Sequence, residues 1–163
     1  AQLERLLQAT QTPVREIYQG DRLLLDDELT IEVRHPPRTG MLDGDNSNSV
    51  TLTIDFAGRR ILLPGDLEGL GLTSVMAELP YDCDILLAPH HGSRRSDPPG
   101  FAAWCQPESV VSSGRRGQAA GDVQATYESH GARVLHTDRQ GAVDFRITPG
   151  GRIRWATWIG GPN

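Results

Sequence analysis

Residues 46–66 read NSNSVTLTIDFAGRRILLPGD, and this stretch decides the fold. From Val50 to Phe56 apolar residues alternate with polar ones, which is the period of a half-buried β-strand. A short turn follows, and residues 60–63 bring the chain back as a second apolar strand. Because the unit ends on Pro64-Gly65-Asp66, it predicts a β-β pair that delivers the Asp66 carboxylate to the edge of a sheet.

The segments around this unit predict a β-rich first half followed by alternating strands and helices. We expect further strands at residues 14–18, 23–25, 29–33, 84–88, 109–112, 133–136, 143–147 and 152–158, and helices at residues 2–9, 67–79, 97–105 and 119–130. This order indicates a single α+β domain over residues 1–163, with helices packed on sheets.

Composition narrows the class of protein. The formal net charge of −5 argues against passive DNA binding, which favours a basic face, but leaves open an enzyme that holds phosphates through metal ions. No apolar run approaches the length of about 20 residues that spans a bilayer, so we expect a soluble domain. Cys83 and Cys105 form no CxxC motif, and we interpret both as buried free thiols.

Two strand ends carry the residues best suited to chemistry. Asp66 follows a glycine that permits close approach to a ligand, and we interpret it as a ligand of a hard cation or as the N-cap of the next helix. The second end is His90-His91-Gly92-Ser93, after the apolar strand 84–88. Adjacent histidines at a strand end point in different directions. One imidazole can therefore bind zinc or manganese while its neighbour supports it, and the alternative is a pair of surface histidines.

The remaining polar residues have less specific interpretations. Asn46 to Ser49 can bond backbone in a turn or orient metal ligands, and we favour the turn. His130 is interpreted as a helix C-cap and His35 as a loop residue, while His136, at another strand end, is a possible ligand. The arginines beside the strand ends either hold phosphates or form a solvated basic loop; they are Arg94, Arg95, Arg115 and Arg116.

Taken in order, these segments resemble a known family. The pieces are the stretch quoted above, DILLAPHHGSRRS at 84–96, SVVSSG at 109–114 and HGARVLHTDRQGAV at 130–143. Over about residues 20–148 they resemble the metallo-β-lactamase-like C-terminal domain of the ComEC competence proteins. Gly65-Asp66 and His90-His91-Gly92-Ser93 are the most specific motifs, and Thr137-Asp138 with Gly141-Ala142-Val143 supports them.

The resemblance implies an αββα sandwich with divalent metals, Mn or Zn, at the sheet edges, two in an intact site. It implies Asp66, His90 and His91 as metal ligands, and Asp66, His91 and Ser93 as catalytic residues. The implied activity is that of a nuclease of a DNA-uptake protein, which cleaves phosphodiester bonds of single-stranded DNA with metal-activated water. The implied partner is the membrane channel domain of the same parent protein, on the extracytoplasmic side of the bacterial inner membrane, and no small-molecule cofactor is expected.

Two departures from the family pattern keep a second function open. The family's first His-x-Asp-x-Asp-His motif is absent, so we interpret the chain as N-terminally truncated. Ser112-Ser113-Gly114 is followed by RRGQAAGDVQA, without the family's His-Pro. We therefore expect the isolated chain to bind metal weakly and turn over little. The alternative is a degenerate, non-catalytic module that binds DNA or a partner protein, and a weaker one is a hydrolase of the same fold acting on a small ester or lactam.

Overall fold

A seven-stranded mixed sheet forms the centre of the molecule. The computed structural model describes residues 2–24, 28–114, 121–159 and 161–162. The sheet has the strand order β1-β2-β3-β4-β5-β6-β7. Its strands are β1 (Arg22–Leu24), β2 (Leu29–His35), β3 (Thr51–Phe56), β4 (Arg59–Leu63), β5 (Ile85–Leu87), β6 (Ser109–Ser112) and β7 (Arg133–His136). The strands thus lie in the order in which they occur along the chain.

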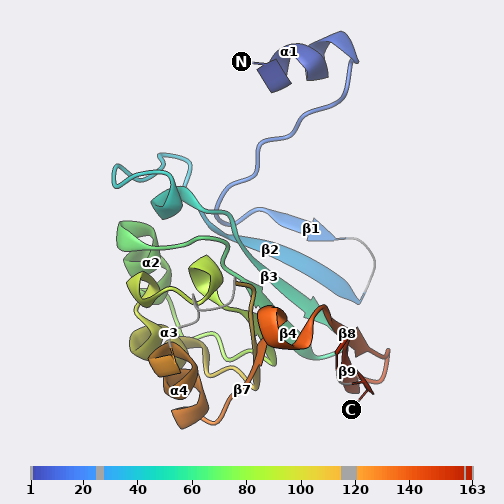
Figure 1. Ribbon diagram of the computed structural model, residues 1–163. Coiled ribbons are helices and arrows are strands. Elements are labelled where there is room, and N and C mark those ends of the chain that lie inside the picture. Colours follow the sequence, from blue (N-terminus) through green and yellow to red (C-terminus); the bar gives the residue numbers. More distant parts are fainter. Residues whose placement is uncertain (1, 25–27, 115–120, 160, 163) are drawn as a thin grey trace.

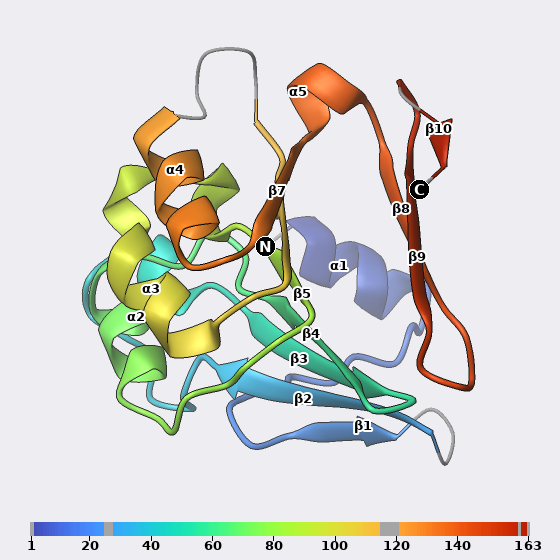
Figure 2. The same cartoon turned by 90° about the horizontal axis from the view of Figure 1, so that it is seen from below.

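The sheet changes character at β4. Strands β1 to β4 pair antiparallel, whereas β4 to β7 pair parallel. Parallel neighbours need crossover connections, and here α2 (Gly69–Met76), α3 (Pro98–Cys105) and α4 (Gly121–Ser129) lie in those connections. All three helices cover the same face of the sheet, as Figure 2 shows. The parallel strands therefore end together at one edge.

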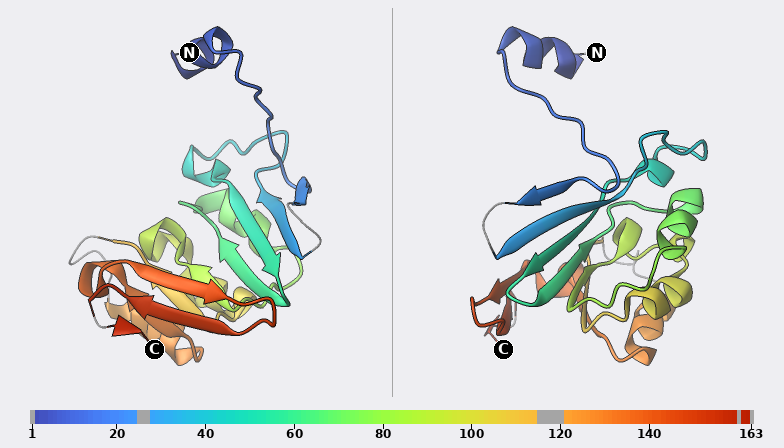
Figure 3. Two further views of the ribbon diagram at one scale, coloured as in Figure 1. Left: turned by 90° about the vertical axis from the view of Figure 1, so that its right-hand side faces the viewer. Right: turned by 180° about the vertical axis from the view of Figure 1, so that it is seen from behind.

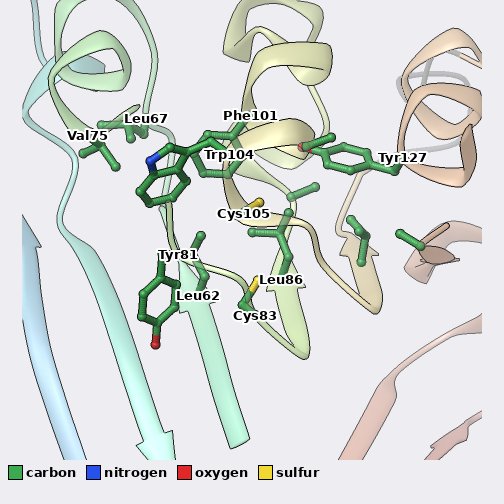
Figure 4. Packing of buried hydrophobic residues seen from close by; sticks show 14 of the residues in the cluster. Leu62, Leu67, Val75, Tyr81, Cys83, Leu86, Phe101, Trp104, Cys105 and Tyr127 are labelled. Atoms are coloured by element: carbon green, nitrogen blue, oxygen red, sulfur yellow. The ribbon is translucent and has the colours of Figure 1, made fainter. Parts of the chain in front are cut away.

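The hydrophobic core lies between this sheet and the three helices (Figure 4). Leu62 of β4, Leu86 of β5 and Val110 of β6 are fully buried. They are neighbours across the sheet, because Leu62 is paired with Leu86 and Leu86 with Val110. Phe101 and Trp104 of α3 stack on each other over this face with ring centroids 5.6 Å apart. The parallel strands are thus the most completely buried part of the sheet.

A second sheet lies on the opposite side of the seven-stranded one (Figures 2 and 3). It has the order β10-β9-β8 and consists of β8 (Val143–Ile147), β9 (Ile153–Thr157) and β10 (Gly161–Pro162). The Arg59 Nε of β4 donates to the Gly151 carbonyl at 2.6 Å, and the Arg133 guanidinium of β7 lies 5.0 Å from the centre of the Trp155 ring. The short helix α5 (Thr137–Gln140) connects the two sheets. The described residues thus form three layers, helices, sheet and sheet.

Most of the expected elements are present, and the α+β class is confirmed. The structure has α1 (Gln2–Ala9) as a helix that stands away from the sheets (Figure 1). Residues 14–18 were expected as a strand, which is wrong: they form no strand, and Val14 is 66% exposed. Short β-branched runs form strands where they can be buried, and no such burial is available here. Residue 25, the last residue of the strand expected at 23–25, lies outside the described residues.

Two single-residue predictions have clear outcomes in the fold. Cys83 and Cys105 are free and buried, as expected. His35 is not a loop residue, so that prediction is wrong: it ends β2, pairs with Thr51 across a register shift, and is 1% exposed. The strand continues to the residue before Pro36 because Pro disfavours helix, not extended backbone, at the position before it. Among the described residues no helix is long and apolar enough to cross a membrane.

Candidate functional site

The candidate site lies at the carboxyl ends of the parallel strands. Because β4, β5, β6 and β7 run in the same direction, the residues that follow them meet at one edge of the sheet. Those residues are Asp66 after β4, His90 and His91 after β5, Ser113 after β6, and His136 at the end of β7. The order of strands in the sheet thus gathers polar side chains that lie far apart in sequence.

Asp66 and His91 are brought together at this edge. The Asp66 Oδ1 lies 3.5 Å from the His91 Nε2, and the two side chains are 49% and 55% exposed. On its other side the His91 Nδ1 lies 3.0 Å from the Ser113 Oγ. A half-exposed ion pair contributes little stability. The pair therefore adds little to the stability of the fold, and it lies in the open at the common edge of the parallel strands.

The backbone that presents the histidines is unusual. His90, His91 and Gly92 all have positive φ, at 46°, 58° and 85°. Left-handed backbone costs a non-glycine residue about 1 kcal/mol or more and is concentrated at functional sites. The His90 N–H donates to the Gly65 carbonyl at 2.9 Å, which ties this turn to the end of β4. Gly92 is required, because a Cβ there would lie 2.8 Å from the Ser112 Oγ.

His90 points to a different partner from His91. Its Nδ1 donates to the Glu68 Oε2 at 2.9 Å, and the other oxygen of Glu68, Oε1, accepts from the Asn46 Nδ2 at 3.1 Å. The Asn46 amide and then His90 hold the pKa of the Glu68 carboxyl below its usual range, because both donate to its charged form. Sequence reasoning missed Glu68. The feature of the sequence that could have indicated Glu68 is its position two residues after Asp66, at the end of the same strand.

The structure also shows the hydrogen bonds of the other residues considered at these two strand ends. Asp66 is not the N-cap of α2, because that position is Glu68, whose side chain makes no capping bond. Asp43 instead accepts from the Leu70 N–H at 3.0 Å. Ser93, expected near the chemistry, accepts from the Arg95 N–H at 3.2 Å and caps the short 3₁₀ helix η3 (Arg94–Ser96).

Two roles were considered for residues 46–49, bonding the backbone of a turn and orienting side chains of the site, and the stretch has hydrogen bonds of both kinds. Asn48 bonds backbone in the loop, accepting from the Met41 N–H at 2.7 Å and donating to the Met41 and Gly44 carbonyls. Asn46 instead orients Glu68. The interpretation as a turn is therefore confirmed for Asn48, whereas Asn46 bonds a side chain of the site.

The remaining histidines and arginines have partners of their own. The His130 Nδ1 donates to the Thr126 carbonyl at 2.9 Å, which confirms the helix C-cap. His136 is buried, and its Nε2 bonds the Gln124 Oε1 of α4 at 3.0 Å. Burial first, and then Arg139, lowers the pKa of His136, and its contact with Gln124 joins the end of β7 to α4. Of the arginines, Arg94 pairs with Asp122 at 2.8 Å, and Arg115 and Arg116 lie outside the described residues.

The donor atoms of Asp66 and His91 fit a shared cation as two of its ligands. Two ligands at about 2.1 Å from a tetrahedral zinc lie about 3.4 Å apart, close to the observed 3.5 Å. A closed tetrahedral site takes four ligands. Within the described part of the chain no group of three or more such side chains could hold a metal. The joint ligand set of Asp66, His90 and His91 therefore stays a prediction.

Comparisons with known proteins agree with this architecture. The chain is 31% identical over 151 residues to ComE operon protein 3 of Bacillus subtilis (strain 168), a match that covers 88% of this chain and 19% of that protein. It is 29% identical over 147 residues to competence protein ComA of Neisseria gonorrhoeae, covering 83% and 21%. The resemblance to ComEC-type competence proteins is confirmed. The ComEC-like chain spans about a fifth of the length of these curated relatives.

The fold has a solved counterpart. A crystal structure from Parabacteroides distasonis ATCC 8503, of a protein named as a metal-dependent hydrolase, matches with a TM-score of 0.53 and 14% identity. The match covers 80% of the ComEC-like chain and 60% of that chain. At this identity it shows the fold alone, which is metallo-β-lactamase-like. No protein-family model matches the chain.

Proposed function

We propose that this chain is the metal-dependent hydrolase domain of a DNA-uptake protein and takes part in cleaving phosphodiester bonds of DNA. The observation that carries the proposal is the 3.5 Å approach of the Asp66 Oδ1 to the His91 Nε2 at the common edge of the parallel strands. The similarity to competence proteins supports the DNA-uptake context. The hydrolase-like fold supports the reaction class.

The chemistry follows from what each side chain offers. A divalent metal, manganese or zinc, lowers the pKa of bound water to about 7 and stabilises phosphate oxygens. Asp66 supplies an anionic oxygen and His91 a nitrogen for that ion. Because both side chains are about half exposed, a polymeric substrate can reach them from solvent. Arg95, exposed and four residues after His91, is proposed to pair with a phosphate.

Two ligands hold a metal weakly, so the remaining ligands are proposed to come from other parts of a longer protein and from water. The domain is proposed to act beside the membrane channel of that protein, on the extracytoplasmic side. Single-stranded DNA is the proposed substrate. In this account the isolated chain binds manganese weakly and turns over little.

A non-catalytic module is the second candidate. It is favoured by the ligand set, because among the described residues no group of three or more His, Cys, Asp or Glu side chains could hold a metal. The net charge of −5 makes a partner protein more suitable than bare DNA for such a module. The two candidates differ in one observable. The hydrolase cleaves DNA when a divalent metal is present, whereas the module binds its partner and leaves DNA intact.

The test is manganese-dependent cleavage of labelled single-stranded DNA by the full-length protein that carries this chain. We expect D66N and H91N each to lower the rate by at least about 100-fold, because a lost metal ligand removes several kcal/mol of transition-state stabilisation. The matched controls are D144N, on an exposed strand, and H130N, at a helix end; both should cleave like the wild type.

Three outcomes separate the candidates. Cleavage lost in D66N and H91N but kept in the controls supports the hydrolase. Wild-type cleavage by D66N contradicts it. No cleavage by the full-length wild type under any divalent metal, together with retained binding of a partner, favours the module. Rapid cleavage by the isolated chain would show that ligands outside it are dispensable.

A further inference from the structure

Glu68 lies between His90 and Asn46, and the proposed function gives it no role. It lies between the end of β4 and the first residue of α2, and its two oxygens have different partners. Oε2 accepts from the His90 Nδ1 at 2.9 Å, and Oε1 accepts from the Asn46 Nδ2 at 3.1 Å. The His90 and Glu68 side chains are 28% and 22% exposed. This pair is thus markedly better shielded than Asp66 and His91.

The chemistry of this contact fixes the tautomer of His90. An ionised carboxylate only accepts hydrogen bonds, so a neutral His90 bonded to it carries its proton on Nδ1. The lone pair is then on Nε2, which is the atom a metal binds. Carboxylate–histidine pairs of this kind orient metal-binding imidazoles in proteins. His91 is held differently: the Ser113 hydroxyl can either donate to its Nδ1 or accept from it, and the Asp66 Oδ1 lies 3.5 Å from its Nε2.

The bridge rests on a buried support. The Ser47 Oγ donates to the Glu68 carbonyl at 3.0 Å, and the His35 Nε2 donates to the Ser47 carbonyl at 2.7 Å. Ser47 and His35 are each 1% exposed. The loop that contains Asn46 is therefore anchored to the end of β2, and it holds the Glu68 backbone as well as its side chain.

We propose that Glu68 is a positioning residue that fixes His90 in the Nδ1–H tautomer, so that the His90 Nε2 is presented as a metal-binding nitrogen, and that Asn46 holds Glu68 in place. The inference rests on the proposed function for the identity of the ligand. It assigns a fixed tautomer to His90 before a metal binds.

The experiment reads the tautomer directly in the metal-free protein. Nitrogen-15 NMR of the imidazoles is recorded at about pH 8, above the usual histidine pKa of about 6.5, on the wild type, E68A, E68Q and E108A. We expect His90 to be protonated on Nδ1 in the wild type and to lose this preference in E68A. E68Q should weaken it, because a Gln side chain can either accept from Nδ1–H through its oxygen or donate to an unprotonated Nδ1 through its NH2 group. E108A, which removes an exposed carboxylate between α3 and β6, should leave it unchanged.

A second measurement connects the tautomer to metal binding. Zinc titrated by calorimetry should bind E68A about 10- to 100-fold more weakly than the wild type, with N46A and E68Q intermediate. A wild-type His90 that carries its proton on Nε2, or one that keeps the Nδ1–H tautomer in E68A, overturns the proposal. So does unchanged zinc affinity in E68A when the tautomer has changed.

These readouts separate the two proposals. If His90 behaves as expected while the full-length protein cleaves no DNA, the proposed function fails and the positioning role stands. If cleavage depends on Asp66 and His91 but the tautomer of His90 is insensitive to E68A, the positioning role fails alone. Loss of folding in E68A is checked by its amide spectrum, and E68Q then carries the comparison of tautomer and affinity together with N46A.

Discussion

The antiparallel strands β1–β3 and the parallel strands β4–β7 belong to one sheet but serve different purposes. Antiparallel neighbours end at opposite edges, so the residues that follow them are dispersed. Parallel neighbours end at the same edge, which brings Asp66, His91 and Ser113 together. The parallel half also lies under the helices, with Leu62, Leu86 and Val110 fully buried, while Leu52 and Ile54 of β3 are half-buried. The more deeply buried half of the sheet thus ends in the exposed polar edge.

The largest expected effect is the loss of stability when a leucine in the parallel half of the sheet is replaced by alanine, compared with a leucine in the antiparallel half. Leu86→Ala in β5 should lower the free energy of unfolding by about 3 kcal/mol, because it leaves a cavity in a fully buried layer. Leu52→Ala in β3 should cost about 1 kcal/mol, since that side chain is only partly buried. Urea unfolding of both variants checks the pair. Equal losses would contradict the division of the sheet into a buried and a half-buried part.

A carboxylate at the start of β5 should have the next largest effect. The two oxygens of Asp84 accept from the Arg59 Nη1 and from the Arg60 backbone N–H, both at 2.7 Å, which joins β4 to β5. Asp84→Ala should cost about 2 kcal/mol, the range for hydrogen bonds to charged groups. Asp144→Ala, whose pair with Arg146 is exposed, should cost less than about 0.5 kcal/mol. Thermal unfolding of the two variants measures the difference.

Gly92 tests the turn that presents the histidines. Gly92→Ala places a methyl group 2.8 Å from the Ser112 Oγ on a backbone with φ of 85°, and we expect a loss of about 2 kcal/mol. Gly20, with φ of 90°, has open space around its missing Cβ, so Gly20→Ala should cost about 1 kcal/mol from the backbone alone. If both variants unfold at the same denaturant concentration, the close approach of β5 and β6 at this edge is wrong.

The smallest expected effect is a pKa shift. The pKa of Glu68 is lowered first by Asn46 and then by His90. A lowered carboxyl pKa contributes stability above the pKa of the unfolded chain, and this contribution is lost as the pH falls through the pKa of the folded state. Asn46→Ala should therefore raise the pKa of Glu68 and flatten the loss of stability on acidification. Carbon-13 NMR titration of Glu68 checks this, with Asn48→Ala, which removes only loop bonds, as control.

Much of this arrangement could be predicted from sequence because its signals are local. The alternation from Val50 to Phe56 predicts β3, and the apolar runs before Asp66 and His90 predict β4 and β5. The approach of Asp66 to His91 follows from two strand ends that share an edge. Each of these inferences needs only the periodicity of one segment and the rule that parallel strands end together.

The parts that could not be predicted depend on backbone angles and distant partners. Glu68 binds His90 because His90 and His91 both adopt left-handed backbone, which no propensity anticipates. Ser113 reaches His91 only once β6 is paired with β5. His35 is buried because β2 continues past a register shift to Thr51, whereas its following proline suggested a loop. Non-local packing, rather than residue type, decides each of these cases.

The most direct measurement is the position of a metal bound to this edge. Crystals of the protein soaked in zinc, with anomalous diffraction collected at the zinc edge, locate the ion without reference to activity. The account predicts a peak at about 2.1 Å from both the Asp66 Oδ1 and the His91 Nε2. An ion bound elsewhere, or saturating zinc that leaves both of these atoms without a metal, would contradict it.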